Sequence, residues 1–207
     1  EKAMRRIINS TFVSIDGVIK DPQDWPSLGG GNGNGNGNGN GNGKDKDKGD
    51  GDAQTELLLG CDGVLFGRHT YHSFASVWQG RSGDPYTDKI NAMDKYVVSS
   101  AMDKADWDDT TVLGGDVIGK IAELKEGPGG DIVQYGFGRL SHELMEHGLL
   151  DELRLWIHPF FVGRSGGDDG LLFRDGTRAM FELNETRGYP SGIVLLSYRL
   201  KPEAAAA

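Results

Sequence analysis

The chain of 207 residues has the length of one ordinary domain, and its hydrophobic fraction of 37% is sufficient for one core. Its formal net charge is −9, from 22 basic and 31 acidic residues, so its surface should repel nucleic acid. Cys61 is the only cysteine, which excludes an internal disulfide and a cysteine-based zinc site and favours a cytoplasmic location. No apolar run approaches the roughly 18 residues needed to cross a bilayer, so no membrane partner is expected.

The chain opens with a strand, followed by a long polar segment. Residues 6–15 are rich in β-branched side chains and end at Asp16-Gly17, which predicts a strand and a turn. Residues 29–52 alternate Gly with Asn and then opposite charges, and they offer almost nothing that a core could bury. We therefore expect a flexible low-complexity segment outside the fold, either natural or engineered, within a single domain that spans residues 1–207.

Strands and helices alternate along the remainder of the chain. We predict helices at 53–61, 69–78, 85–94, 117–125 and 139–147, and strands at 63–66, 96–99, 111–113, 131–135, 153–161, 179–186 and 192–200. This alternation indicates an α/β fold with a mainly parallel central sheet flanked by helices. No helix separates the last two strands, which predicts a C-terminal antiparallel hairpin.

One predicted strand runs through Gly67 directly into a helix. A helix N-terminus exposes free backbone N–H groups, which suit a phosphate. Arg68 adds a fork of donors and Thr70 adds a hydroxyl group. Taken alone, this junction is explained as well by a glycine that permits the turn and an arginine that is simply solvated.

A second junction of the same kind is Gly136-Phe137-Gly138-Arg139-Leu140, which follows the predicted strand 131–135. Ser141 replaces the third glycine of a dinucleotide fingerprint, and no acid follows at the ribose-binding distance, which argues against a standard NAD site. A third strand end carries Ser99 and Ser100. Because ligands collect at the carboxyl ends of strands in open α/β sheets, the three ends together indicate a nucleotide site.

These segments resemble the dihydrofolate reductase superfamily. Gly67-Arg68-His69-Thr70 is similar to the segment that holds the phosphates of NADPH in that family, and Asp16-Gly17-Val18-Ile19 with Trp25 resembles its first loop. The phrase Leu149-Leu150-Asp151-Glu152-Leu153, with His158-Pro159, is similar to the riboflavin-pathway reductase (RibD C-terminal domain) branch. The resemblance implies a dihydrofolate reductase-like fold, NADPH as the cofactor and a small pterin- or pyrimidine-like heterocycle as the substrate.

The resemblance also implies which residues contact each ligand. The expected cofactor contacts are Phe12, Ile19, Gly67, Arg68, His69, Thr70, Ser99, Ser100, Gly136, Phe137, Gly138, Arg139 and Leu140. Asp16 and Trp25 are expected to contact the substrate. No metal site is expected, because His142 and His147 are five residues apart and do not share a helix face.

The catalytic acid is not assigned by the sequence. Dihydrofolate reductases carry a carboxylate a few residues beyond the first-loop Trp, whereas this chain has Leu28-Gly29-Gly30 there, and Asp16 and Asp24 are the nearest alternatives. Two functions therefore stay open, an NADPH-dependent reductase and an NADP(H)-binding module of the same fold without turnover. A homodimer formed through the apolar segment 153–161 is a further expectation.

Overall fold

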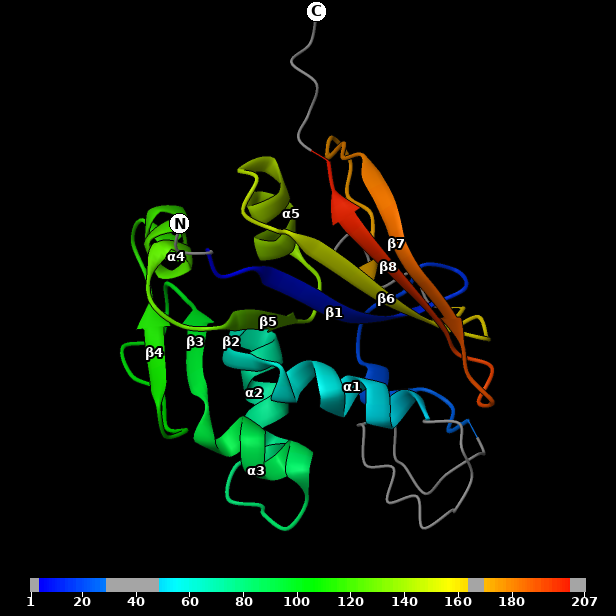
Figure 1. Cartoon of the computed structure of the whole chain (residues 1–207), viewed down its shortest axis with the longest axis horizontal. Helices are drawn as coiled ribbons and strands as arrows, with labels where there is room; N and C mark the ends of the chain where they lie inside the picture. Colours follow the sequence, from blue (N-terminus) through cyan, green and yellow to red (C-terminus); the bar gives the residue numbers. More distant parts are fainter. Residues whose placement is uncertain (1–3, 29–48, 164–169, 202–207) are drawn as a thin grey trace, which may run out of the picture.

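The computed structural model describes residues 4–28, 49–163 and 170–201 (Figure 1). Its elements in chain order are β1 (Ile7–Ser14), η1 (Pro22–Asp24), α1 (Asp50–Leu59), β2 (Cys61–Gly67), α2 (Arg68–Trp78), α3 (Pro85–Ala92), β3 (Asp94–Val98), β4 (Thr110–Leu113), α4 (Val117–Glu126), β5 (Asp131–Tyr135), α5 (Arg139–Glu146), β6 (Glu152–His158), β7 (Phe181–Gly188) and β8 (Val194–Leu200). None of the described helices is long and apolar enough to cross a membrane.

The described strands form one sheet of eight strands in the order β4-β3-β2-β5-β1-β6-β8-β7. Every pair from β4 to β6 is parallel, while β8 pairs antiparallel with both β6 and β7. The mainly parallel sheet and the C-terminal antiparallel hairpin are therefore confirmed. Parallel strands all end at the same edge, which brings the carboxyl ends of β1, β2 and β5 together.

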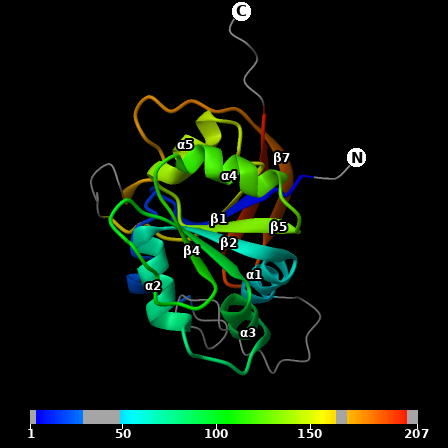
Figure 2. The same cartoon turned by 90° about the vertical axis from the view of Figure 1, so that its left-hand side faces the viewer.

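Helices cover both faces of the sheet (Figure 2). On one face, Leu57 and Leu58 of α1 pack with Phe66 and Val133 and with residues from α2 and α3. On the other face, Ile121 of α4 and Leu144 of α5 pack against a separate apolar cluster that includes Ile7 and Ile132. The alternation of side chains along each strand divides the core into these two layers.

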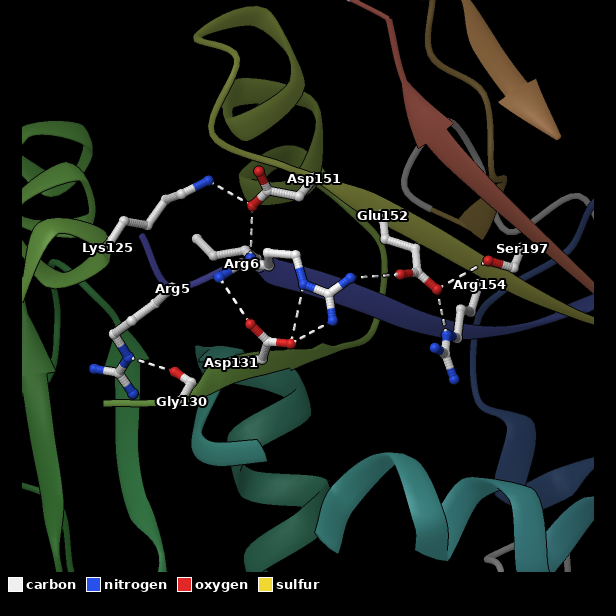
Figure 3. A network of polar contacts seen from close by, with 10 residues as sticks. Arg5, Arg6, Lys125, Gly130, Asp131, Asp151, Glu152, Arg154 and Ser197 are labelled. Atoms are coloured by element: carbon white, nitrogen blue, oxygen red, sulfur yellow. Dashed lines mark hydrogen bonds and ion pairs between the residues drawn. The ribbon is translucent and has the colours of Figure 1, made fainter. Parts of the chain in front are cut away.

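Paired charges join the strand ends opposite the glycine junctions (Figure 3). Asp151 accepts a hydrogen bond from the backbone N–H of Ile7 at 2.7 Å and also pairs with Lys125. Nearby, Arg6 pairs with Asp131, and the Arg6 guanidinium lies 3.6 Å from Glu152. These contacts hold β1, β5 and β6 in register and leave those charges neutralised.

Several element boundaries differ from the predicted ones. Helix α1 begins at Asp50, inside the segment that was expected to lie wholly outside the fold. Asp52 accepts a hydrogen bond from the N–H of Gly49 at 3.2 Å, and Asp50 accepts one from Ser191 at 3.0 Å. Carboxylates in a first helical turn satisfy free N–H groups, so residues 49–52 belong to the fold, while residues 29–48 lie outside the described residues.

The strand predicted at 153–161 ends at His158 because Pro159 follows it and has no N–H to donate to a ladder. The helix predicted at 85–94 ends at Ala92, and Asp94 already belongs to β3. Its start is set by Asp84, whose side chain accepts a hydrogen bond from the N–H of Thr87 at 3.0 Å.

Candidate functional site

A cavity of about 560 Å³ opens at the carboxyl ends of β1, β2 and β5. It is lined by Ser10, Thr11, Phe12, Ile19, Lys20, Asp21, Pro22, Gln23, Gln54, Gly67, Arg68, His69, Thr70, Ser73, Phe74, Trp78, Tyr86, Gln134, Tyr135, Gly136, Phe137, Gly138, Arg139, Leu140 and Ser141. This is the edge of a parallel sheet at which α/β proteins bind their ligands. The cavity is large enough for a small-molecule ligand.

The two glycine junctions meet at this cavity. In the sheet register, Phe66 lies opposite Tyr135, so Gly67 and Gly136 follow on adjacent strands. Gly136 has a φ of +77°, and a Cβ atom there would lie 2.5 Å from the Oγ1 atom of Thr70. Only glycine allows the second turn to approach α2 this closely. The two helix N-termini therefore face one space.

Charged side chains gather at the exposed rim of the cavity, which consists of Lys20, Asp21, Arg68, His69 and Arg139. Among the described residues nothing pairs with the guanidinium of Arg68. The side chain of Arg139 is paired with Glu143 at 2.9 Å, and His69 lies 3.6 Å from Asp21. Arg68 thus differs from the paired arginines at the opposite edge of the sheet, because its donors are free to meet an anion.

The interior of the cavity is neutral and largely aromatic. We call it the inner wall and define it as Ser10, Phe12, Gln54, Phe74, Trp78, Tyr86 and Tyr135. Its side chains come from β1, α1, α2, α3 and β5, and they are buried or half-buried. Burial raises the pKa of Tyr86 and Tyr135, so both phenols stay protonated at neutral pH. None of the residues of the inner wall carries a charge.

The structure brings most of the sequence-predicted cofactor residues together. Those that line the cavity are Phe12, Ile19, Gly67, Arg68, His69, Thr70, Gly136, Phe137, Gly138, Arg139 and Leu140. Ser99 and Ser100 do not line it. The Ser99 hydroxyl accepts hydrogen bonds from the N–H groups of Ala101 and Met102, both at 3.1 Å, and therefore stabilises the turn after β3. Contact of Ser99 and Ser100 with a cofactor stays a prediction.

The two residues predicted to contact the substrate also lie outside the cavity lining. The carboxylate of Asp16 accepts hydrogen bonds from the N–H groups of Val162 and Gly163, at 3.1 and 2.9 Å, and from Ser14. The bond from Ser14 is the main reason that the pKa of Asp16 is lowered. The indole N–H of Trp25 donates to the carbonyl of Lys20 at 3.1 Å, and its ring contacts that of His158.

The cavity lining includes polar residues to which the sequence assigned no ligand, among them Asp21, Gln54 and Ser141. Asp21 is the one carboxylate among the described lining residues, although Asp16 and Asp24 were considered instead. The hydroxyl of Ser141 is buried without a hydrogen-bond partner in the described part of the chain. Gln54 could have been identified from the sequence pattern. It shares a helix face with Leu57 and Leu58 and is therefore a polar residue at a core position.

Comparisons with known proteins agree with this architecture. The "Uncharacterized protein YyaP" of Bacillus subtilis (strain 168) is 29% identical over 150 residues, which are 70% of this chain and 77% of that protein. A solved structure of a putative riboflavin biosynthesis protein from Shewanella sp. PV-4 is similar with a TM-score of 0.67 and 19% identity, covering 96% of this chain and 100% of that one.

A dihydrofolate reductase from Enterococcus faecalis, solved in complex with NADP(H) and RAB-propyl, is similar with a TM-score of 0.59 and 14% identity, covering 95% of this chain and 97% of that one. Likeness at these identities concerns the fold, and it confirms the dihydrofolate reductase-like architecture. The family described as the RibD C-terminal domain matches residues 5–195, which is nearly the whole chain. The chain therefore belongs to the RibD C-terminal domain family, as its sequence motifs indicated.

Proposed function

We propose that this protein is an NADPH-dependent reductase that transfers a hydride to a small pterin- or pyrimidine-like heterocycle. One observation carries the proposal: a single cavity joins two helix N-termini and an unpaired arginine to a neutral aromatic wall. The helix N-termini and the arginine suit phosphates, and the aromatic wall suits a flat uncharged ring. The family and the neighbouring folds support a reductase of this type.

The residues at the rim fit a phosphorylated dinucleotide. Arg68 has free donors, and Thr70 lies beside Gly136, where the backbone of the second turn is closest to α2. Gly138 has open space where a side chain would be, so its backbone is accessible to a ligand. When bound, NADPH would supply the hydride, while these groups would bind its phosphates and Phe12 and Ile19 would flank its nicotinamide.

The inner wall would bind the heterocycle and exclude water from it. It offers no group that could release a proton near neutral pH, because burial raises the pKa of its tyrosines. Asp21 lies at the rim instead. We therefore propose that water at the cavity mouth beside Asp21, rather than a residue of the wall, delivers the proton.

Titration of both cofactors tests the assignment of the phosphate site. We expect NADPH to bind about ten- to a hundredfold more tightly than NADH, because one charge-assisted hydrogen bond contributes roughly 1.5 to 3 kcal/mol. Arg68→Ala should remove most of this preference. Arg81→Ala, at an exposed position outside the cavity lining, should keep it. Equal affinities of the wild type for the two cofactors would overturn the assignment.

The second candidate function is an NADP(H)-binding module without turnover. It is favoured by the inner wall, which has no carboxylate to support protonation of a substrate. Oxidation of NADPH, followed at 340 nm with pterins, pyrimidines and quinonoid compounds, separates the two. Binding of NADPH with no oxidation by any of these compounds supports the module, and turnover with one of them supports the reductase.

The predicted homodimer and the cytoplasmic location remain predictions. β6 pairs with β1 on one side and β8 on the other, so a second chain cannot join the sheet at this strand. A dimer contact near the segment 153–161 would instead use exposed side chains such as Phe161, which follows β6. Light scattering of the purified protein decides between monomer and dimer.

A further inference from the structure

Asn9 of β1 is a buried amide in a mainly apolar layer of the core. The residue is 0% exposed, and it lies directly opposite Gln134 in the parallel pairing of β1 with β5. On the same face of β1, Ile7 and Val13 are buried and apolar. An amide at such a position is less favourable than an apolar side chain of the same shape unless its hydrogen bonds are made.

The hydrogen bonds of the Asn9 amide are made within the protein. Its nitrogen donates to the Oε1 atom of Gln134 at 2.9 Å and to the backbone carbonyl of Gly136 at 2.8 Å, and its oxygen accepts from the Thr11 hydroxyl at 2.8 Å. A carbonyl oxygen can only accept, so the contact with Gly136 fixes the orientation of the amide. Asn9 is not among the described residues that line the cavity, so it can affect a ligand only through its partners.

The bond to the Gly136 carbonyl sets the direction of the next backbone N–H group. The peptide unit between Gly136 and Phe137 is trans, and in a trans unit the C=O and the following N–H point in opposite directions. Because Asn9 holds the carbonyl on the side of β1, the N–H of Phe137 points away from β1. Since β5 lies between β1 and β2 (Figure 1), that direction leads toward the end of β2, where Arg68 begins α2.

The sheet itself does not hold this peptide unit. The parallel pairing of β5 with β1 and with β2 ends at Tyr135, one residue before Gly136. Gly136 has a φ of +77°, and glycine can adopt several backbone conformations at little cost. The amide of Asn9 therefore takes the place of a ladder hydrogen bond just beyond the last paired residue.

We propose that Asn9 is a positioning residue for the turn from Gly136 to Gly138. It holds the carbonyl of Gly136 toward β1, so that the N–H of Phe137 is presented to the phosphate bridge of the cofactor before the cofactor binds. Asn9 itself does not contact the cofactor. A turn that is already ordered binds more tightly, because less conformational entropy is lost on binding. The inference rests on the proposed function and deepens it, because it explains how the same site is kept in its binding conformation.

Two variants test the proposal by titration with NADPH and NADH. Asn9→Leu removes both donors at a similar shape, and Asn9→Asp keeps an acceptor for Thr11 but replaces the donors with a second acceptor. We expect each variant to bind NADPH at least about tenfold more weakly than the wild type. The preference for NADPH over NADH should stay within about twofold of the wild-type value, because both cofactors contain the phosphate bridge and the extra phosphate is assigned to Arg68.

Asp151→Asn is the matched control for lost stability. Asp151 accepts a hydrogen bond from the N–H of Ile7 at the other end of β1, at 2.7 Å, and it pairs with the buried Lys125. It is not among the described residues that line the cavity. Loss of its charge should lower the melting temperature and leave the affinity for NADPH unchanged, since the turn keeps its contact with Asn9.

The outcomes separate the role of Asn9 from the proposed function. If the wild type binds NADPH and a folded Asn9 variant binds it equally well, the positioning role is wrong while the proposed function stands. A lost preference for NADPH in the Asn9 variants, or an equal loss of affinity in Asp151→Asn, would mean that the defect is not confined to the turn and would contradict the role. Failure of both Asn9 variants to fold would assign Asn9 to stability instead. If the wild type does not bind NADPH, the proposed function itself fails.

Discussion

At the scale of single residues, the side chains of Arg68 and Thr70 belong to the cavity lining, whereas that of Asp16 does not. Arg68 and Thr70 line the cavity, and they were predicted because they follow a strand and a glycine. Contact of Asp16 with a substrate stays a prediction, and its carboxylate accepts hydrogen bonds from the N–H groups of Val162 and Gly163. The sequence could not reveal these two hydrogen bonds, since residues 162 and 163 are far from residue 16 along the chain.

His158 makes the stability of the fold dependent on pH. Burial lowers its pKa, and its Nδ1 atom is 2.9 Å from the carbonyl of Trp156. Because the folded pKa lies below the unfolded value of 6.5, the unfolded chain binds more protons as the pH falls through 6.5. The free energy of unfolding should therefore decrease from pH 7.5 to pH 5.5, a range that brackets that value. The pKa of His142 is lowered by burial as well, so it acts in the same direction.

Urea denaturation of His158→Gln at a series of pH values measures this contribution. The variant should lose less stability than the wild type as the pH falls, because glutamine does not titrate. His147→Gln, at an exposed position, serves as the matched control. A pH dependence identical to that of the wild type in His158→Gln would show that His158 does not contribute.

At the scale of elements, glycine-containing turns were predictable, but their steric roles were not. Gly136 and Gly138 look equivalent in the sequence. In the structure, Gly136 has a positive φ and lies against Thr70, whereas Gly138 has an extended backbone and nothing within 4 Å of its Cβ position. The difference arises from the parallel pairing of β2 with β5, which no local pattern reveals.

Alanine substitutions separate the roles of these two glycines. Gly136→Ala should lower the free energy of unfolding by about 1 to 3 kcal/mol, because the positive φ is strained for alanine and its Cβ would meet Thr70. Gly138→Ala should leave stability unchanged or raise it by up to about 1 kcal/mol, because its backbone suits any residue. Chemical denaturation measures both, and similar losses in the two variants would contradict this account of the turn.

At the scale of the whole molecule, alternating strands and helices were sufficient to predict the layers and the parallel sheet. The strand order was not predictable from periodicity, because β5 lies between β1 and β2 although it comes much later in the chain. The extent of the fold was also misjudged. Residues 49–52 form the start of α1, since their carboxylates are held by Gly49 and Ser191.

Shortening the low-complexity segment tests its predicted independence from the fold. Removal of residues 33–42, which repeat Gly and Asn, should change the free energy of unfolding by less than about 1 kcal/mol, because loop-closure entropy depends weakly on length. A deletion that extends through residues 49–52 should destabilise the protein much more, since it removes the first turn of α1. Equal effects of the two deletions on the melting temperature would contradict this boundary.

NADPH is proposed to bind across the turn from Gly136 to Gly138, and one titration tests this binding most directly. Gly138→Val places a branched side chain in the space that the ligand would occupy, while the extended backbone at this position tolerates valine. We predict that the wild type binds NADPH, and that Gly138→Val binds it at least about tenfold more weakly with an unchanged melting temperature. Failure of the wild type to bind NADPH, or equal affinities in the two proteins, would contradict the claim.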